Sequence, residues 1–261
     1  MCEVIGSFKN IIYEKKNGVA RITVNRPPLN VLNVETLQEM VKALEDIDED
    51  ASIKVLVIRG SGQKAFSAGV EIEDHFPDKI EETLDSFHRV FHLLADINKP
   101  TVAAVHGFAF GGGCELAMAC DIVFASEDAQ FGQQEVKVGA IPTVATVLLP
   151  RIVGRKKALE MIFTGDIITA AEAKQIGLIN DICPVGGLEE AVNSLLGKFK
   201  KKSPVVLQLI RMAILQGLNK DFKEALHGVT SIYLNNLIKT EDAVEGLNAF
   251  LEKREPRWKG K

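Results

Sequence analysis

Glu115 is the residue whose type and setting most clearly indicate acid/base chemistry. It follows three consecutive glycines, Gly111–Gly113, and its neighbours Cys114 and Leu116 are apolar. An unpaired carboxylate in apolar surroundings is costly, so it takes up a proton or finds a partner, and such groups are candidates for function. The alternative is that Glu115 only stabilises the first turn of a helix through the helix dipole.

A second carboxylate, Glu135, follows in the stretch Phe131–Glu135. Taken alone, a glutamate in this polar stretch is typical of a solvated loop. Taken together with Glu115, it predicts a pair of carboxylates, of which one accepts a proton while the other donates one.

The glycines Gly111–Gly113 end an apolar strand pattern and begin an apolar helix pattern. Glycine lets a backbone approach a ligand closely, and a helix N-terminus supplies free N–H donors and a partial positive charge. The phosphate-binding spacings G-x-G-x-x-G and G-x-x-x-x-G-K-[ST] are absent here, so an oxyanion site is favoured over a phosphate site. Close packing of the helix against the strand would require the same glycines and remains an alternative.

The segment Ala65–Val70 follows another apolar strand pattern and the glycines Gly60 and Gly62. A loop of small residues after a parallel strand commonly faces a ligand, and its backbone N–H can supply a second oxyanion donor. Ser67 lies outside a G-x-S-x-G elbow, which argues against a hydrolase nucleophile.

His88 and His92 are spaced i, i+4, but the sequence between them does not give the H-E-x-x-H metal motif. Both flank the apolar stripe of a predicted helix. Structural roles are therefore favoured over a metal site.

Strands alternate with helices along the first part of the chain. Asn17-Gly18 is a strong hairpin signal between two predicted strands, and short unbroken apolar runs predict strands that are buried on both faces. These strands are expected at residues 11–13, 19–24, 55–58, 102–105 and 122–125, with amphipathic helices at 34–50 and 79–97. The alternation predicts an α/β fold with a largely parallel sheet.

After Gly154 the pattern becomes helical. Thr169–Glu172 is a capping box, and Ser203-Pro204 is typical of a helix start. Further helices are predicted at 221–237 and 241–251. Their apolar faces require burial against the core or against a partner subunit.

Composition excludes some classes of function. The 261 residues carry a formal net charge of −4, which argues against nucleic-acid binding through a general basic surface. The run Lys198–Lys202 is a candidate anion patch, but a solvated helix end is the favoured interpretation. The apolar window Thr101–Cys120 contains four glycines, His106 and Glu115, so a membrane span is not expected.

The cysteines are Cys2, Cys114, Cys120 and Cys183, and no two of them form a C-x-x-C pair. So few cysteines in a chain of this length predict free thiols in a reducing compartment. The first residues lack an apolar core of signal-peptide length, and a cytoplasmic location is expected.

Four segments together resemble the crotonase (enoyl-CoA hydratase/isomerase) superfamily. They are Ala65–Glu71, Gly111–Asp121, Phe131–Pro142 and Gly165–Leu178, in the order of the family, and Ala249–Trp258 resembles the terminal helix of the family. The resemblance implies an α/β spiral of repeated β-β-α units over residues 1–200 and a helical trimerisation region over 201–261. It also implies homotrimers, often paired as hexamers.

The resemblance further implies an acyl-CoA substrate whose thioester oxygen is held by the backbone N–H groups of Ala68 and Gly112. It implies substrate contacts from Ala68, Gly69, Val70, Glu71, Gly111, Gly112, Thr143 and Val144. It implies coenzyme A contacts from Leu29, Val31 and Lys253. No metal or redox cofactor is implied, because coenzyme A enters as part of the substrate.

Hydratases of this family carry glutamates at the positions of Glu115 and Glu135. The resemblance therefore implies a lyase that adds water across the α,β double bond of an enoyl- or dienoyl-CoA, with Glu115 as base and Glu135 as proton donor to Cα. Two features depart from the common hydratases. Pro142–Thr146 replaces a glycine-rich run, and Glu71 replaces an aspartate. Both departures resemble hydratases of cyclic dienoyl-CoA thioesters such as cyclohexa-1,5-diene-1-carbonyl-CoA.

Two other functions are compatible with the sequence. One is a double-bond isomerase on the same scaffold, which usually relies on a single carboxylate. The other is a catalytically silent trimeric acyl-CoA-binding protein, which the intact glutamate pair disfavours. Nucleic-acid binding is disfavoured by the negative net charge.

Overall fold

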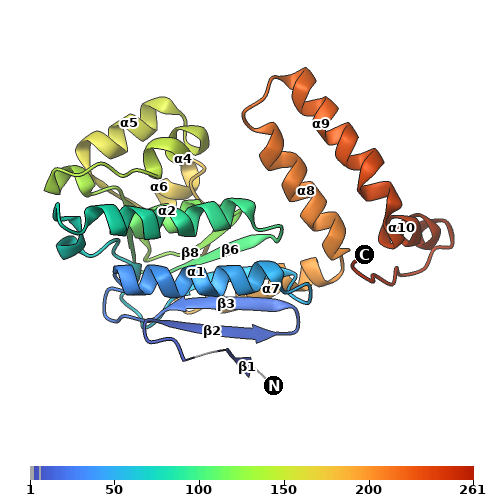
Figure 1. Ribbon diagram of the computed structural model, residues 1–261, viewed down its shortest axis with the longest axis horizontal. Coiled ribbons are helices and arrows are strands. Elements are labelled where there is room, and N and C mark those ends of the chain that lie inside the picture. The colour runs from blue at the N-terminus through green and yellow to red at the C-terminus, as the bar shows by residue number, and fades with distance from the viewer. Residues whose placement is uncertain (1–2, 6) are drawn as a thin grey trace. The chain divides into compact units, whose positions relative to one another are not determined.

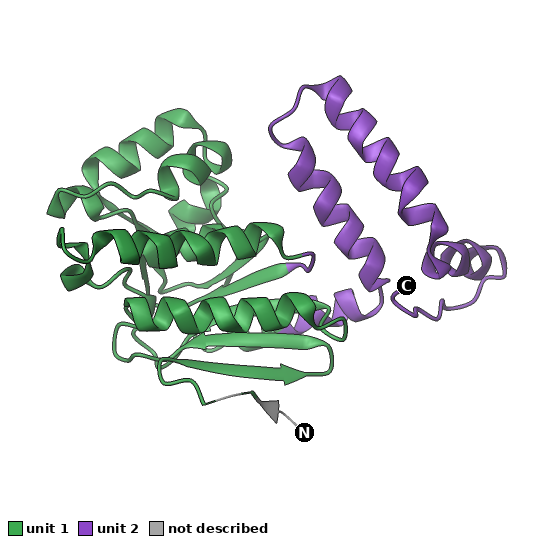
Figure 2. Cartoon of the chain, in the orientation of Figure 1, with its two compact units in different colours: residues 1–97, 101–192 green, residues 98–100, 193–261 purple. Residues whose placement is uncertain are grey.

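The computed structural model describes residues 3–5 and 7–261, so Cys2 lies outside the described residues. The chain forms two compact units, one of residues 1–97 with 101–192 and the other of residues 98–100 with 193–261 (Figure 2). The predicted division after residue 200 falls at the end of helix α7 (Leu188–Lys200), whereas the compact units divide inside that helix.

The predicted hairpin is confirmed. Strands β2 (Ile11–Lys16) and β3 (Val19–Val24) pair antiparallel across Asn17-Gly18, and both turn residues have positive φ, 52° and 78°. These angles are the reason for an Asn-Gly turn, because Asn and Gly adopt the left-handed region most readily. The short strand β1 (Glu3–Val4) extends this edge of the sheet.

The central part of the chain winds as a spiral that contributes one strand to each of two sheets in every turn. The larger sheet has the order β1-β2-β3-β4-β6-β8-β11, and its neighbours from β3 onward are parallel. The smaller sheet has the order β10-β9-β7-β5. The strands of the spiral are β4 (Val55–Gly60), β5 (Ala65–Ser67), β6 (Thr101–Val105), β7 (Phe108–Phe110), β8 (Ile122–Ser126) and β9 (Gln130–Gly132). The predicted α/β fold of β-β-α repeats is therefore confirmed.

Two long helices flank the larger sheet, as Figure 1 shows. Helix α1 (Val34–Glu49) packs against β2, β3 and helix α2 (Ile80–Asp96). Each helix buries the apolar stripe that its sequence predicts, and Leu37, Leu44 and Phe87 are among the residues of the core. The third helix, α3 (Gly112–Met118), is short and entirely buried.

The remainder of the first unit follows β9. A 3-10 helix (Glu135–Val138) leads to α4 (Ala145–Ile152), α5 (Arg155–Thr164), β10 (Ile167–Thr169), α6 (Ala170–Gln175) and β11 (Asp181–Cys183). The capping box at the start of α6 is confirmed: Thr169 accepts from the Glu172 amide, and the Glu172 carboxylate accepts from the Thr169 amide. In the described part of the chain, no helix is both long and apolar enough to span a bilayer.

The second unit contains α8 (Pro204–Gly217), α9 (Phe222–Asn235) and α10 (Glu241–Leu251). Asp242 anchors the chain end to this unit, because its buried carboxylate accepts from the Ser203 hydroxyl at 2.6 Å and from the Lys259 amide at 2.7 Å. Large apolar side chains remain exposed on all three helices, including Ile214, Phe222, Tyr233, Leu247 and Phe250.

Candidate active site

Glu115 lies in the first turn of α3, within the first unit, and its side chain is almost completely buried, with 2% exposed. One carboxylate oxygen, Oε1, accepts the backbone N–H of Ala145 at 2.7 Å. Burial raises the pKa of Glu115 to about 8; the Ala145 amide opposes this rise, and the charge of Glu135 adds to it. The protonated form is therefore the main form of this carboxyl at neutral pH.

Glu135 is the first residue of the 3-10 helix and lies beside the glycine turn. A Cβ atom at Gly111 would stand only 2.7 Å from Glu135 Oε1, so the carboxylate occupies the space that a side chain at position 111 would fill. The other oxygen, Oε2, is buried and has no hydrogen-bond partner among the described residues. Burial raises the pKa of Glu135 above its ordinary value. Glu135 thus lies against the glycine turn that precedes Glu115, near enough for its charge to act on the Glu115 carboxyl.

Two backbone segments meet beside this pair. A Cβ on Gly69 would lie 3.3 Å from the Gly112 nitrogen, and a Cβ on Gly113 would lie 2.2 Å from the Ser67 carbonyl oxygen. The glycines therefore allow α3 to pack directly on β5, which was the alternative explanation of the glycine run. They also place the loop after β5 next to the start of α3. The glycine run Gly111–Gly113 therefore serves the close packing of α3 on β5 and also forms the turn that faces the loop after β5.

The two predicted oxyanion donors differ in their hydrogen bonding. Gly112 is the first residue of α3, so its N–H has no acceptor within the helix. The Ala68 N–H already donates to the Leu29 carbonyl oxygen at 2.9 Å. A thioester oxygen at Ala68 must therefore share this N–H with Leu29 or displace the carbonyl. No local sequence pattern indicates this bond, because it joins two loops that are distant in sequence.

A buried asparagine holds Leu29 in that position. The Asn30 side-chain amide is fully buried and donates to the carbonyl oxygens of Ser61 at 2.9 Å and Ala65 at 2.7 Å. Asn30 itself has a left-handed φ of 51°. This residue fastens the segment before α1 to the strand that leads into the oxyanion loop.

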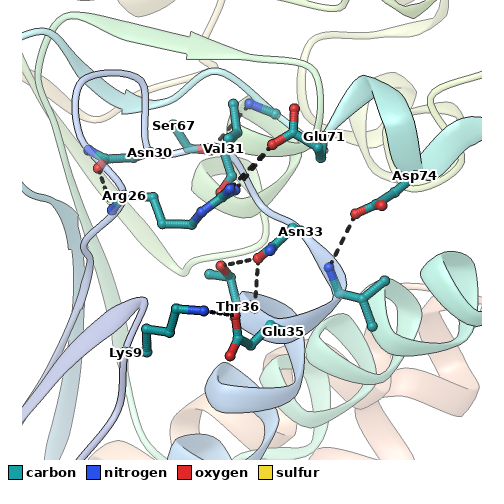
Figure 3. A network of polar contacts seen from close by, with 12 residues as sticks. Lys9, Arg26, Asn30, Val31, Asn33, Glu35, Thr36, Ser67, Glu71 and Asp74 are labelled. Carbon is teal, nitrogen blue, oxygen red and sulfur yellow. Dashed lines mark hydrogen bonds and ion pairs between the residues drawn. The ribbon is translucent and has the colours of Figure 1, made fainter.

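The Glu71 carboxylate, which was expected to contact the substrate, is paired with Arg26 at 3.3 Å (Figure 3). Arg26 also donates to the carbonyl oxygen of Val31 at 3.0 Å. Glu71 and Val31 thus brace the loops around Leu29. Lys253, the third predicted coenzyme A contact, lies at the end of α10 in the second unit.

The remaining predicted contacts lie close to the pair. Val70 stands against Gly112, where an added Cβ would be 3.0 Å from Val70 Cγ2. Thr143 and Val144 directly precede the Ala145 amide that binds Glu115. The Thr143 hydroxyl lies 2.9 Å from Nε2 of His88, which comes from α2. The histidine spacing gave no signal for this contact, since position 143 is far away in sequence.

Known proteins of one family match nearly the whole chain. The family model described as enoyl-CoA hydratase/isomerase matches residues 14–261. A crotonyl-CoA hydratase from Syntrophomonas wolfei is 37% identical over 253 residues, which cover 95% of this chain and 97% of that protein. A short-chain-enoyl-CoA hydratase from Clostridium acetobutylicum is 38% identical over 255 residues, which cover 95% and 96% of the two chains.

Solved structures agree as well. The crystal structure of an enoyl-CoA hydratase from Bacillus anthracis superposes with a TM-score of 0.93 at 34% identity, covering 97% of this chain and all of that one. Sequence and fold match these relatives over nearly the whole length of the chain. The chain therefore belongs to the enoyl-CoA hydratase/isomerase family.

Proposed function

We propose that this chain hydrates the α,β double bond of a 2-enoyl-CoA thioester. The observation that carries the proposal is the closeness of the buried carboxylate of Glu115 and the partly buried carboxylate of Glu135 to the N–H of Gly112, which has no acceptor within its helix. Hydration needs a base for water, an acid for Cα and a donor for the thioester oxygen, and the site offers all three. Relatives named as crotonyl-CoA and short-chain-enoyl-CoA hydratases support the same substrate class.

In the proposed reaction, the thioester oxygen lies between the N–H groups of Gly112 and Ala68. Glu115, in its ionised form, takes a proton from water as the water oxygen bonds to Cβ. The electron pair of the double bond moves toward the thioester oxygen, where the N–H donors stabilise the negative charge of the enolate. Glu135 then delivers its proton to Cα, and the proton held by Glu115 restores Glu135 through solvent.

This scheme needs no metal or redox cofactor, since coenzyme A is part of the substrate. The Ala68 N–H can stabilise the thioester oxygen only when its hydrogen bond to the Leu29 carbonyl oxygen is broken or shared with that oxygen. We therefore infer that Gly112 is the stronger donor at the start of the reaction. Loss of one donor from such a hole typically costs about 100- to 1000-fold in rate.

A cyclic dienoyl-CoA is a second candidate substrate, and a specific observation favours it. The turn beside Glu115 carries the side chains of Thr143 and Val144, where common hydratases have a glycine-rich run. Both side chains are partly buried, and the Thr143 hydroxyl is held by His88. The turn beside Glu115 therefore carries side chains rather than bare backbone, and we infer that these side chains select the shape of the acyl group.

We expect kcat/KM to depend on pH as a bell-shaped curve. The reactive form of the pair holds one proton, so it exists between loss of the first and the second proton. The raised pKa of Glu115 keeps this proton mainly on Glu115 at rest, so the proton must pass to Glu135 before Glu115 can accept one from water. Burial raises both pKa values and places the last loss at about 8. Activity should rise with pH through the lower pKa and fall as pH passes about 8.

Initial rates with crotonyl-CoA below KM, measured across both limbs, test this prediction. A matched measurement with Glu127→Gln, an exposed glutamate after β8, controls for general charge effects. A rate that stays constant through pH 8 would show that the pair does not titrate as its burial requires.

We further propose that the chain forms homotrimers, single or paired as hexamers, through the second unit. Exposed apolar side chains on α8, α9 and α10 support this proposal, because faces of this kind are usually covered by a partner. Light scattering should give a mass of three or six chains. Phe250→Asp, at a residue that is 83% exposed, should shift the population toward single chains if its face is buried between copies. A monomeric wild-type protein would contradict the proposal.

Three cysteines of the described chain, Cys114, Cys120 and Cys183, are buried and form no disulfide bond. Burial raises the pKa of the Cys114 thiol to about 12, so this thiol is unreactive at neutral pH. Thiols of this kind support the proposed cytoplasmic location.

A further inference from the structure

Helix α2 contacts the candidate active site at two adjacent residues. Phe87 packs against the oxyanion glycine, since an added Cβ on Gly112 would lie 3.0 Å from Phe87 Cε2. The next residue, His88, has its Nε2 2.9 Å from the Thr143 hydroxyl. One helix therefore touches both the donor for the thioester oxygen and the turn that holds the catalytic carboxylate.

The turn that contains Thr143 is closed by its own hydrogen bonds. The Thr146 amide donates to the Pro142 carbonyl oxygen at 2.9 Å, and the Thr146 hydroxyl donates to the Thr143 carbonyl oxygen at 2.8 Å. Ala145, between them, donates its N–H to Glu115 Oε1 at 2.7 Å. Any shift of Thr143 is thus transmitted through one short, internally bonded turn to the carboxylate.

We propose that His88 is a positioning residue for Glu115. Its ring nitrogen holds the Thr143 hydroxyl, this bond fixes the turn of residues 142–146, and the turn presents the Ala145 N–H to Glu115. The consequence for catalysis rests on the proposed hydratase function, whereas the positioning itself does not. A partly buried hydroxyl needs a hydrogen-bond partner, so threonine at position 143 and histidine at position 88 act as a unit.

Four substitutions test the unit. His88→Leu and Thr143→Val each remove one partner at nearly constant volume, while His88→Gln and Thr143→Ser each retain a polar group that can bond. His92→Leu is the matched control, because His92 is exposed one turn further along the same helix. Circular dichroism and melting temperature identify any variant that fails to fold, and the two disruptive variants act from different elements.

The first readout is the titration of Glu115, followed by NMR in protein with ¹³C-labelled glutamate carboxyls and assigned by comparison with Glu115→Gln. The Ala145 amide lowers the pKa of Glu115, against burial and the nearby charge of Glu135, which both raise it. Loosening the turn should therefore move the pKa of Glu115 further upward in His88→Leu and in Thr143→Val. The double variant should shift it no further than either single variant, and His92→Leu should leave it unchanged.

The second readout is the steady-state rate with crotonyl-CoA. A misplaced base should lower kcat by roughly 3- to 10-fold, which is the worth of one hydrogen bond, with KM within about twofold. His88→Gln and Thr143→Ser should recover most of the rate. The effects of His88→Leu and Thr143→Val should not multiply in the double variant, because both break the same contact.

The proposal is overturned if both disruptive variants titrate like the wild type, if their effects are independent, or if His92→Leu has the same effect as His88→Leu. A wild type that shows no hydration, together with the expected NMR shifts, would reject the proposed function and retain the positioning role. If the wild type hydrates crotonyl-CoA but His88→Leu leaves the Glu115 titration and kcat unchanged, the proposed function is retained and the positioning role is rejected.

Discussion

Replacing Glu115 by Gln should reduce hydration of crotonyl-CoA by about 100- to 10,000-fold, the usual contribution of a general base. Glutamine keeps an oxygen that accepts the Ala145 N–H, so the fold around α3 is preserved. What the variant loses is the ability to take a proton from water. A double-bond isomerase that relies on one other carboxylate would keep its activity in this variant, so the same substitution separates the two reactions.

The same variant should be more stable than the wild type at alkaline pH. Burial raises the pKa of Glu115 from 4.5 to about 8, so between these values the folded chain keeps a proton that the unfolded chain has released. Stability therefore falls as pH rises through this window, and the loss is complete above about pH 8. Glutamine never ionises, so the variant avoids a penalty of up to about 5 kcal/mol.

Urea unfolding of both proteins on either side of this window measures the difference. Glu127→Gln, at an exposed position, should change neither the activity nor the pH dependence of stability. Near-normal hydration by Glu115→Gln would remove Glu115 from the mechanism. An unchanged stability profile would show instead that its carboxyl is not buried as described.

Replacing Gly113 by Ala should damage both the fold and the activity. The added Cβ would meet the Ser67 carbonyl oxygen at 2.2 Å and Ser67 Cβ at 2.8 Å, and neither atom belongs to a flexible side-chain end. Helix α3 must then move away from β5, at a cost of about 1–3 kcal/mol or more. This movement would carry the Gly112 N–H away from the loop at Ala68, and we expect a loss of about 100- to 1000-fold in kcat.

Gly197→Ala provides a matched control for this prediction. Gly197 lies inside helix α7, and no atom stands within 4 Å of an added Cβ. The substitution should stabilise the protein by about 0.5–1 kcal/mol, because alanine loses less conformational entropy in a helix. The melting temperatures of the two variants should therefore shift in opposite directions, and only Gly113→Ala should lose activity. A Gly113→Ala protein as stable and active as the wild type would contradict the close approach of α3 and β5.

Local patterns predicted strands β2, β3, β4, β6 and β8 of the larger sheet and the long helices α1 and α2, whereas β1 and β11 were not predicted. The strand Val55–Gly60 follows from an unbroken apolar run, helix α1 follows from apolar residues at helical spacing, and the hairpin follows from Asn17-Gly18. The smaller sheet was missed, because its strands, such as Ala65–Ser67, are three residues long. A stretch of that length has no readable period, so the segment was interpreted as part of a loop.

The site was predicted in its residue types but not in its hydrogen bonds. Burial of Glu115 follows from its apolar neighbours, and the space for Glu135 follows from Gly111. The bond from Ala68 to Leu29 and the contact of His88 with Thr143 join segments that only the tertiary fold brings together. Neither contact leaves a local pattern in the sequence, because the partners are far apart along the chain and only the winding of the spiral brings them close.

The most direct measurement is the absorbance of the conjugated enoyl thioester, with crotonyl-CoA and cyclohexa-1,5-diene-1-carbonyl-CoA offered separately to the wild type and to Glu115→Gln. A carboxylate pair that adds water to an enoyl-CoA predicts loss of the conjugated band with the wild type and a nearly constant band with the variant. Turnover of the cyclic diene alone would assign the side chains of Thr143 and Val144 to a ring-shaped acyl group. A constant band with both substrates and the wild-type protein would contradict the proposed hydratase activity.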